Sequence, residues 1–261
     1  MFPKKIILFI FSVIITLFIW SCGSSAEYTS AKMAIEKENW EEAEEYLFKA
    51  LEIEPANAEI MVQIGYHVHA KKRQWTEMNK MFNQAIEIDP NAKVLGRPVT
   101  EITKNYQTMF WADNYNKAIR KYNESRRSQD KSTLQSATDL FNETLDIDPG
   151  EAQTYSILAN CYYELGDSKN AVENAKKAHE LMPNEYRSNY TLGQILALTG
   201  DKENAIAYIE KAVEIAPTEQ GAVKQLAGLY YETGLKEKSI ETFELAIKQE
   251  SDKSAKANLY F

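Results

Sequence analysis

Four similar stretches of sequence, LEIEP at 51–55, IEIDP at 86–90, LDIDP at 145–149 and VEIAP at 213–217, set the register of this chain. Each combines apolar and acidic residues and ends in a proline, which lacks the N–H group that would continue a helix. Pro183 lies midway between Pro149 and Pro217, so prolines recur there with a fixed period of ~34 residues, which we call the repeat period. Such a period predicts stacked helical pairs, because one pair alone cannot cover its apolar face.

Small and bulky residues recur in one phase after Pro149. The small ones are expected to let the two helices of a pair approach, and the bulky ones to fill the layer between pairs. In 152–185 they are Tyr155, Leu158, Ala159, Tyr162, Gly166, Ala171, Ala175 and Ala178; in 186–219 they are Leu192, Gly193, Leu196, Gly200, Ala205, Ile209 and Ala212; in 220–251 they are Leu226, Ala227, Tyr230, Gly234, Ser239, Phe243 and Ala246.

This pattern resembles the tetratricopeptide repeat family. The resemblance implies an all-α fold, a right-handed α-solenoid of antiparallel helix pairs with about six repeats. It also implies that other proteins or peptides bind along the concave face of the first helices.

The upstream units follow the pattern more loosely. Units at 27–57 and 58–91 are expected, the second with one extra residue near its turn. The step from Pro90 to Pro149 is much longer than the repeat period, so the third unit, 97–150, should be enlarged. Its apolar stripe predicts either one helix over 99–126 or two shorter helices with a bend. The final stretch, 252–261, reads as a capping helix or a truncated further repeat.

The first residues differ from the rest. Lys4 and Lys5 precede an apolar run that is followed by Ser21 and Cys22, which is typical of a secretory signal over 1–21. The placement of Cys22 resembles a bacterial lipoprotein signal, which implies acylation of Cys22 and a short tether, 22–26. An uncleaved anchor, or a signal cut elsewhere, is the alternative. The expected location is the cell membrane or outer membrane, facing the periplasm or the cell exterior.

Charge and chemistry argue against other classes of function. The net charge is −8, whereas nucleic-acid binders normally carry a basic excess, so nucleic acid is not an expected partner. His67 and His69 are two positions apart on a predicted helix and would diverge, so no metal site is expected. Cys161 is expected to be a buried structural thiol. We therefore expect no enzyme activity, no catalytic residue and no small-molecule cofactor.

Two surfaces are candidates for binding. The first is a tyrosine-rich groove along the first helices, where flat rings and hydroxyl groups suit extended peptides or a partner helix. The alternative is that these tyrosines only span core and surface. The carboxylate clamp of the family is not predicted, because Asn160 is its only match. The groove residues are Tyr66, Asn160, Tyr163, Tyr190, Gln194, Lys224 and Tyr231.

The second surface is a basic cluster at the end of the enlarged helix. It is either a solvated helix end or a docking point for acidic protein or lipid headgroups. Its residues are Lys117, Arg120, Lys121, Arg126, Arg127 and Lys131.

Together these features predict a membrane-tethered scaffold of the bacterial cell envelope that binds partner proteins or peptides. The alternative function is an envelope accessory protein that binds a small solute or peptidoglycan for a neighbouring enzyme or transporter.

Overall fold

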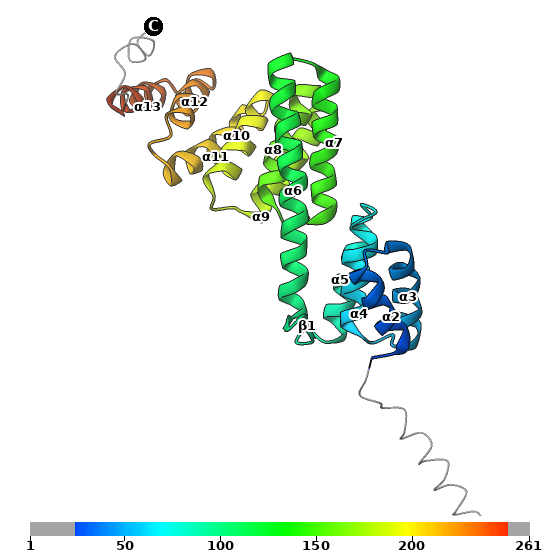
Figure 1. The fold of residues 1–261 in the computed structure, drawn as a ribbon. Helices are drawn as coiled ribbons and strands as arrows, with labels where there is room; N and C mark the ends of the chain where they lie inside the picture. Colours follow the sequence, from blue (N-terminus) through cyan, green and yellow to red (C-terminus); the bar gives the residue numbers. More distant parts are fainter. Residues whose placement is uncertain (1–23, 250–261) are drawn as a thin grey trace, which may run out of the picture. The chain divides into compact units, whose positions relative to one another are not determined.

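The computed structural model describes residues 24–249 and divides into two compact units, Met1–Tyr106 and Gln107–Phe261 (Figure 1). Within the described residues the predicted all-α fold of antiparallel helix pairs is confirmed. The expectations for Cys22, for the signal 1–21 and for the stretch 252–261 lie outside the described residues. No helix among residues 24–249 combines the length and the hydropathy that a membrane span needs.

The first unit contains two helix pairs and a small hairpin. Its elements are α2 (Ala26–Glu36), α3 (Trp40–Ile53), α4 (Ala58–Ile64), a π-helix η1 (Gly65–His69), α5 (Trp75–Ile88), and the antiparallel strands β1 (Lys93–Val94) and β2 (Arg97–Pro98). Its core is a cluster formed by Tyr28, Ala31, Leu47, Ala50, Ile60, Ile64 and Val68.

The second unit stacks the remaining pairs. Helix α6 (Val99–Ser128) begins in the first unit and ends in the second, and the elements after it are α7 (Lys131–Ile147), α8 (Ala152–Leu165), α9 (Ser168–Leu181), α10 (Tyr186–Leu198), α11 (Lys202–Ile215), α12 (Gln220–Glu232) and α13 (Lys236–Gln249). The enlarged third repeat therefore has one continuous first helix of 30 residues, and the alternative of two shorter helices is wrong.

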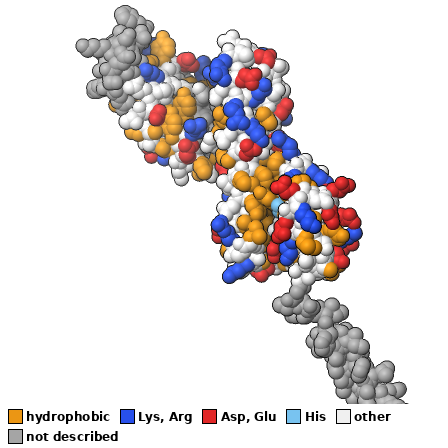
Figure 2. Space-filling view, viewed as in Figure 1, with side chains coloured by type: hydrophobic (Ala, Val, Ile, Leu, Met, Phe, Trp, Pro, Cys, Tyr) orange, Lys and Arg blue, Asp and Glu red, His pale blue; other side chains and the backbone are white. Residues whose placement is uncertain are grey.

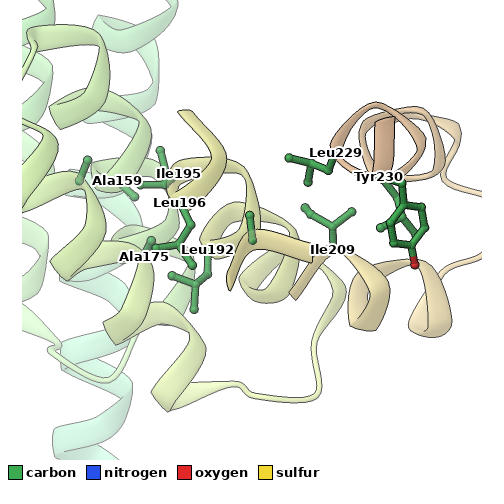
Figure 3. Close-up of a cluster of buried hydrophobic side chains, with 11 residues drawn as sticks. Ala159, Ala175, Leu192, Ile195, Leu196, Ile209, Leu229 and Tyr230 are labelled. Atoms are coloured by element: carbon green, nitrogen blue, oxygen red, sulfur yellow. The ribbon is translucent and has the colours of Figure 1, made fainter. Parts of the chain in front are cut away.

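Buried side chains from successive pairs form the layers of the second unit. Figure 3 shows Leu192, Ile195 and Leu196 of α10 beside residues of α8 and α9. Within the pair, Gly193 faces α11 so closely that an added Cβ would lie 2.7 Å from Ile209 Cδ1. In the last pair the equivalent of Ala205 is Ser239, whose buried hydroxyl donates to the Ala227 carbonyl over 2.9 Å. Small residues thus set the spacing of each pair.

The turn between the two helices of a repeat has the same form throughout. In each repeat one residue has a left-handed backbone, and the second helix begins two residues later. Glycine occupies this position in the last three repeats and a larger residue in the first three: Glu38 (φ 55°), Arg73 (φ 56°), Gln129 (φ 55°), Gly166 (φ 91°), Gly200 (φ 99°) and Gly234 (φ 82°).

The extra residue of the second repeat lies in its first helix and not near its turn. The first helix of that repeat starts at Ala58 and the second starts at Trp75. This spacing is one residue longer than the spacing from Ala152 to Ser168, the two helix starts of the fourth repeat. A π-helical turn, which holds one more residue than an α-helical turn, occurs at Gly65–His69. The turn itself keeps the common geometry, so the insertion changes the helix alone.

We expect opposite effects from alanine at two glycines of the second unit. Gly193→Ala should lower the free energy of unfolding by about 1–3 kcal/mol, because its Cβ would overlap Ile209 and approach the Ala205 carbonyl. The matched control is Gly228→Ala, where nothing lies within 4 Å of the added Cβ. That change should raise the free energy of unfolding by about 0.5–1 kcal/mol, the helix-propensity difference. Urea unfolding measures both, and equal effects would contradict the packing argument.

A second pair of variants tests the left-handed turn position. Gln129→Gly should raise the free energy of unfolding by about 0.5–1 kcal/mol, because glycine adopts a positive φ without steric strain. Gly166→Ala should lower it by about 1 kcal/mol for the same reason. Thermal melting followed by circular dichroism should therefore shift in opposite directions for the two variants, and a stabilised Gly166→Ala would refute the argument.

Candidate functional site

The face shared by α8, α10 and α12 carries six of the seven predicted groove residues. Asn160, Gln194 and Gly228 are each one repeat period apart, so they take the same place on successive first helices. Residues four apart lie on one side of a helix, which places Tyr190 with Gln194 and Lys224 with Gly228. We call this surface of α8, α10 and α12 the repeat face.

The tyrosines of the repeat face differ in exposure. Tyr163 and Tyr190 are half-buried and pack against the core cluster of α8 to α12, and the Tyr190 ring stacks on Tyr186 with centroids 5.6 Å apart. Burial raises the pKa of Tyr190, which therefore stays a neutral hydroxyl at physiological pH. Tyr231 is different, with 66% of its surface exposed. Tyr163 and Tyr190 span core and surface, whereas Tyr231 is free for contact.

A hollow of about 430 Å³ lies between α10 and α12 and is open to solvent. Leu198 lines it with 49% of its surface exposed, so an apolar side chain borders this hollow. An ion pair of 3.0 Å between Lys202 and Glu232 joins α11 to α12 among the lining residues. The lining residues are Ala197, Leu198, Lys202, Gln225, Gly228, Leu229 and Glu232.

Sequence reasoning missed Leu198 and Gly228 as parts of this face. The signal was present, since Gly228 stands one repeat period after Gln194, and Leu198 stands one repeat period after Glu164. Gly228 has open space around it and an ordinary helical backbone, so neither packing nor a positive φ explains a glycine there. With Gly221 two helical turns earlier, it leaves part of the α12 backbone uncovered on the repeat face.

Tyr66, the seventh predicted groove residue, lies in the first unit on the π-helix. Its ring stacks on Tyr106 with centroids 4.1 Å apart, and it meets His67 edge to face at 4.8 Å. His67 in turn stacks on Trp40 at 5.6 Å, and Lys71 Nζ lies 3.5 Å from the centroid of the Trp40 ring. Tyr66 is thus one member of an aromatic row within the first unit.

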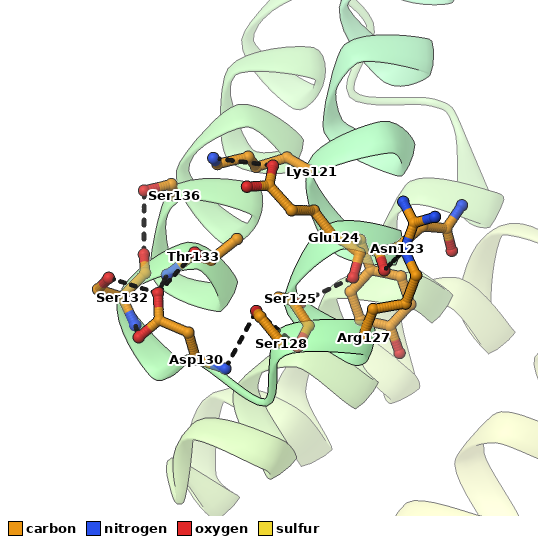
Figure 4. A network of polar contacts seen from close by, with 11 residues as sticks. Lys121, Asn123, Glu124, Ser125, Arg127, Ser128, Asp130, Ser132, Thr133 and Ser136 are labelled. Carbon is orange, nitrogen blue, oxygen red and sulfur yellow. Dashed lines mark hydrogen bonds and ion pairs between the residues drawn. The ribbon is translucent and has the colours of Figure 1, made fainter.

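The predicted basic cluster lies at the end of α6 and the start of α7, where several of its charges have partners. Lys117 pairs with Asp113 at 2.6 Å. Lys121 pairs with Glu124 at 3.0 Å, as Figure 4 shows. Arg126 pairs with Glu164 at 3.0 Å and also donates to the Tyr122 hydroxyl. Arg127 donates to the Asn123 carbonyl. Among the described residues, Arg120 and Lys131 have no ion pair, and both are exposed.

The charge around this cluster is mixed. On the face seen in Figure 2, Lys and Arg side chains lie interspersed with Asp and Glu. Asp130, beside the cluster, caps α7 by accepting from the backbone N–H groups of Ser132 and Thr133 (Figure 4). These local pairs favour a solvated, capped helix end over a docking point.

The described residues hold no group of three or more histidine, cysteine, aspartate or glutamate side chains that could bind a metal ion. His67 packs on Trp40, while His69 Nδ1 lies 2.9 Å from the amide oxygen of Gln74, so the two rings have different surroundings. Burial lowers the pKa of His67 to about 4, which keeps this ring neutral at physiological pH.

Known proteins resemble this chain in repeat and fold. A family model described as tetratricopeptide repeat matches residues 152–185 and 186–219, the units predicted with the same bounds. These two units are therefore tetratricopeptide repeats. No curated protein matches the chain.

Solved structures with similar folds share little sequence with this chain. The structure of YrrB, described as a TPR protein with an unusual peptide-binding site, is 18% identical, covers 81% of this chain and 96% of its own, and has a TM-score of 0.47. The structure of pilF from Pseudomonas aeruginosa is 15% identical with a TM-score of 0.48 and covers 79% of this chain and 82% of its own. A MamA structure is 16% identical with a TM-score of 0.42 and covers 88% of this chain and 92% of its own.

Cys161 should be unreactive in the folded protein. It is completely buried in the cluster of α6, α7 and α8, and burial raises the pKa of its thiol to about 12, so almost no thiolate forms at neutral pH. We expect a maleimide to leave the peptide that contains Cys161 unmodified at pH 7 and to modify it fully in urea. Mass spectrometry of the digested protein distinguishes the two states, and labelling without urea would contradict the burial.

Proposed function

We propose that this protein is a scaffold of the bacterial cell envelope, tethered to a membrane through Cys22, that holds partner proteins or peptides on the repeat face. The binding of proteins or peptides is the general role of tetratricopeptide repeats, two of which this chain contains. The tether rests on the sequence at 1–22, which resembles a lipoprotein signal.

The observation that carries the proposal is the exposed apolar surface of the repeat face. Leu198 and Tyr231 are exposed by 49% and 66%, although the core positions of the same helices are fully covered. Exposed apolar side chains beside an uncovered stretch of helix backbone at Gly228 suit close contact with another polypeptide. The buried side chains of these helices therefore already have packing partners, and the exposed side chains of the repeat face are where a partner protein can add contacts.

The form of the hollow favours a polypeptide over a small solute. Sites for small molecules enclose most of the ligand surface. The hollow between α10 and α12 is open and has the Lys202–Glu232 ion pair among its lining residues, so a small ligand would remain largely in water. An extended chain or a helix can instead cover several neighbouring residues of the face at once.

Crosslinking in cells tests both parts of the proposal. We expect the variant Leu198→Ser with Tyr231→Ala to lose most of the partner crosslinked to the wild type, because both side chains supply exposed contact area and little core packing. Leu181→Ser, exposed by 36% on α9, is the matched control and should keep its partners. Mass spectrometry identifies the crosslinked proteins, and circular dichroism checks the helix content.

The tether has its own readout in the same experiment. Mass spectrometry of the purified chain should find Cys22 as its first residue, carrying the acyl chains that supply the anchoring. Undiminished crosslinking by the Leu198→Ser, Tyr231→Ala chain would exclude the repeat face as the binding site. A mature chain whose Cys22 carries no acyl group would exclude the lipid tether.

A further inference from the structure

The start of α2 is held in place by a hydrogen bond to the end of α3, the second helix of the same pair. The Ser25 backbone N–H donates to Glu54 Oε1 over 2.6 Å, and Asn57 Nδ2 donates to the other carboxylate oxygen over 2.7 Å. Asn57 also caps α4 by accepting from the Glu59 and Ile60 N–H groups. Ser25 is thus fixed at the end of the first unit where α3 ends and α4 begins.

The β1–β2 hairpin lies at the same end of the first unit. A hollow of about 480 Å³ is lined by Glu54 and Asn57 on one side and by Ile88, Ala92 and Lys93 on the other. Figure 1 draws β1 and the start of α2 at this common end. Glu54, which binds Ser25, and Lys93 of the hairpin therefore border one hollow.

The hairpin holds one leucine out into solvent. Val94 of β1 is completely buried and packs toward α4, and Val99, also buried, follows β2, so both ends of the hairpin are anchored. Between the strands, Leu95 and Gly96 form a two-residue turn with φ values of 52° and 80°. Two positive φ values suit Asn-Gly or Gly-Gly, whereas a bulky side chain is disfavoured there. Leu95 is nevertheless present, and 62% of its surface is exposed.

Other exposed apolar side chains and basic side chains occur at this end of the first unit. Ile88, on the hollow, and Ile53, next to Glu54, are exposed by 42% and 56%. Lys93 stands two residues before Leu95, where it can meet phosphate groups, while Arg97, two residues after Leu95, pairs with Glu101 at 3.4 Å. The carboxylates nearby have local partners: Glu54 binds Ser25 and Asn57, and Asp89 accepts from the Asn91 N–H over 2.9 Å. Apolar insertion, and not net charge, would drive contact with lipid.

The position of Cys22 limits how far this end can be from a membrane. Three residue steps separate Cys22 from Ser25, and an extended chain covers at most ~3.6 Å per residue, so the fixed start of α2 lies within about 11 Å of an acylated Cys22. A tether of this length brings the end of the first unit that carries Ser25 to the lipid headgroups.

We propose that this end of the first unit lies against the phospholipid bilayer, with Leu95 inserted among the headgroups. The inference rests on the proposed tether at Cys22 and adds to it a second contact that orients the first unit. One acyl-linked residue alone leaves a protein free to turn on the membrane. Leu95, together with the fixed start of α2, gives the first unit two separate points of contact with the same surface.

The test places an environment-sensitive dye at Leu95→Cys in the acylated full-length chain, reconstituted in vesicles of phosphatidylethanolamine and phosphatidylglycerol. Cys22 carries lipid and Cys161 is buried, so the dye labels the new thiol alone. The matched control is Lys37→Cys, which is exposed at the other end of α2, ~18 Å from Ser25 along the helix. The dye at position 95 should shift to shorter wavelength and be quenched by brominated lipid, and the dye at position 37 should not.

A second variant separates insertion from mere proximity. With the dye moved to Lys93→Cys, the change Leu95→Asp should weaken quenching by brominated lipid, because a carboxylate does not enter the apolar region. Circular dichroism confirms that the chain stays folded.

Two results would overturn the inference while leaving the tether intact. In the first, mass spectrometry shows that the chain is acylated and the chain binds vesicles, but the dye at position 95 remains in water. The other is a dye that becomes shielded only after envelope proteins are added, which would make the occupant a protein. An unacylated Cys22 in a chain that fails to bind vesicles would instead refute the tether, and the inference with it.

Discussion

The close approach of the two helices within each pair is the constraint on which the rest of the structure depends. At Gly193 there is no room for one added carbon, and at Gly65 an added Cβ would lie 2.5 Å from Phe82 Cε1. Because the helices meet so closely, bulky residues such as Leu192 and Leu196 are directed to the layers between pairs. Each pair then presents an apolar side that the next pair covers, which is why the repeats stack.

This constraint leaves the outside of the first helices free to vary. Positions equivalent by the repeat period carry asparagine at 160, glutamine at 194 and glycine at 228, while the buried positions of the same helices remain small or aliphatic. Packing energy comes mainly from the buried set, so substitutions at the exposed positions of the repeat face should cost little stability. In the proposed scaffold, the residues that fold the repeats would therefore differ from those that contact a partner.

Local irregularities occur in the first unit. One additional residue is absorbed as a π-helical turn that presents Tyr66 and His67 to an aromatic row, and the β1–β2 hairpin keeps Leu95 in a left-handed conformation. Both features are disfavoured locally, and both place a large side chain where a regular repeat would not. The second unit contains the two matched repeats. In its last three helix pairs, the number of residues from the start of the first helix to the start of the second helix is the same.

The sequence by itself determined the helices, the repeat bounds at 152–185 and 186–219 and the burial of Cys161, because periodic apolar residues and prolines act locally and repeat. Only the tertiary structure decided that the additional residue of the second repeat enters a helix, since a turn or a helix could absorb it with the same sequence length. It also decided that Lys117, Lys121 and Arg126 have acidic partners, and that Leu198 and Tyr231 are exposed on the repeat face. Exposure and ion pairing depend on which neighbouring helix lies opposite a side chain, and that is fixed only when the pairs have stacked.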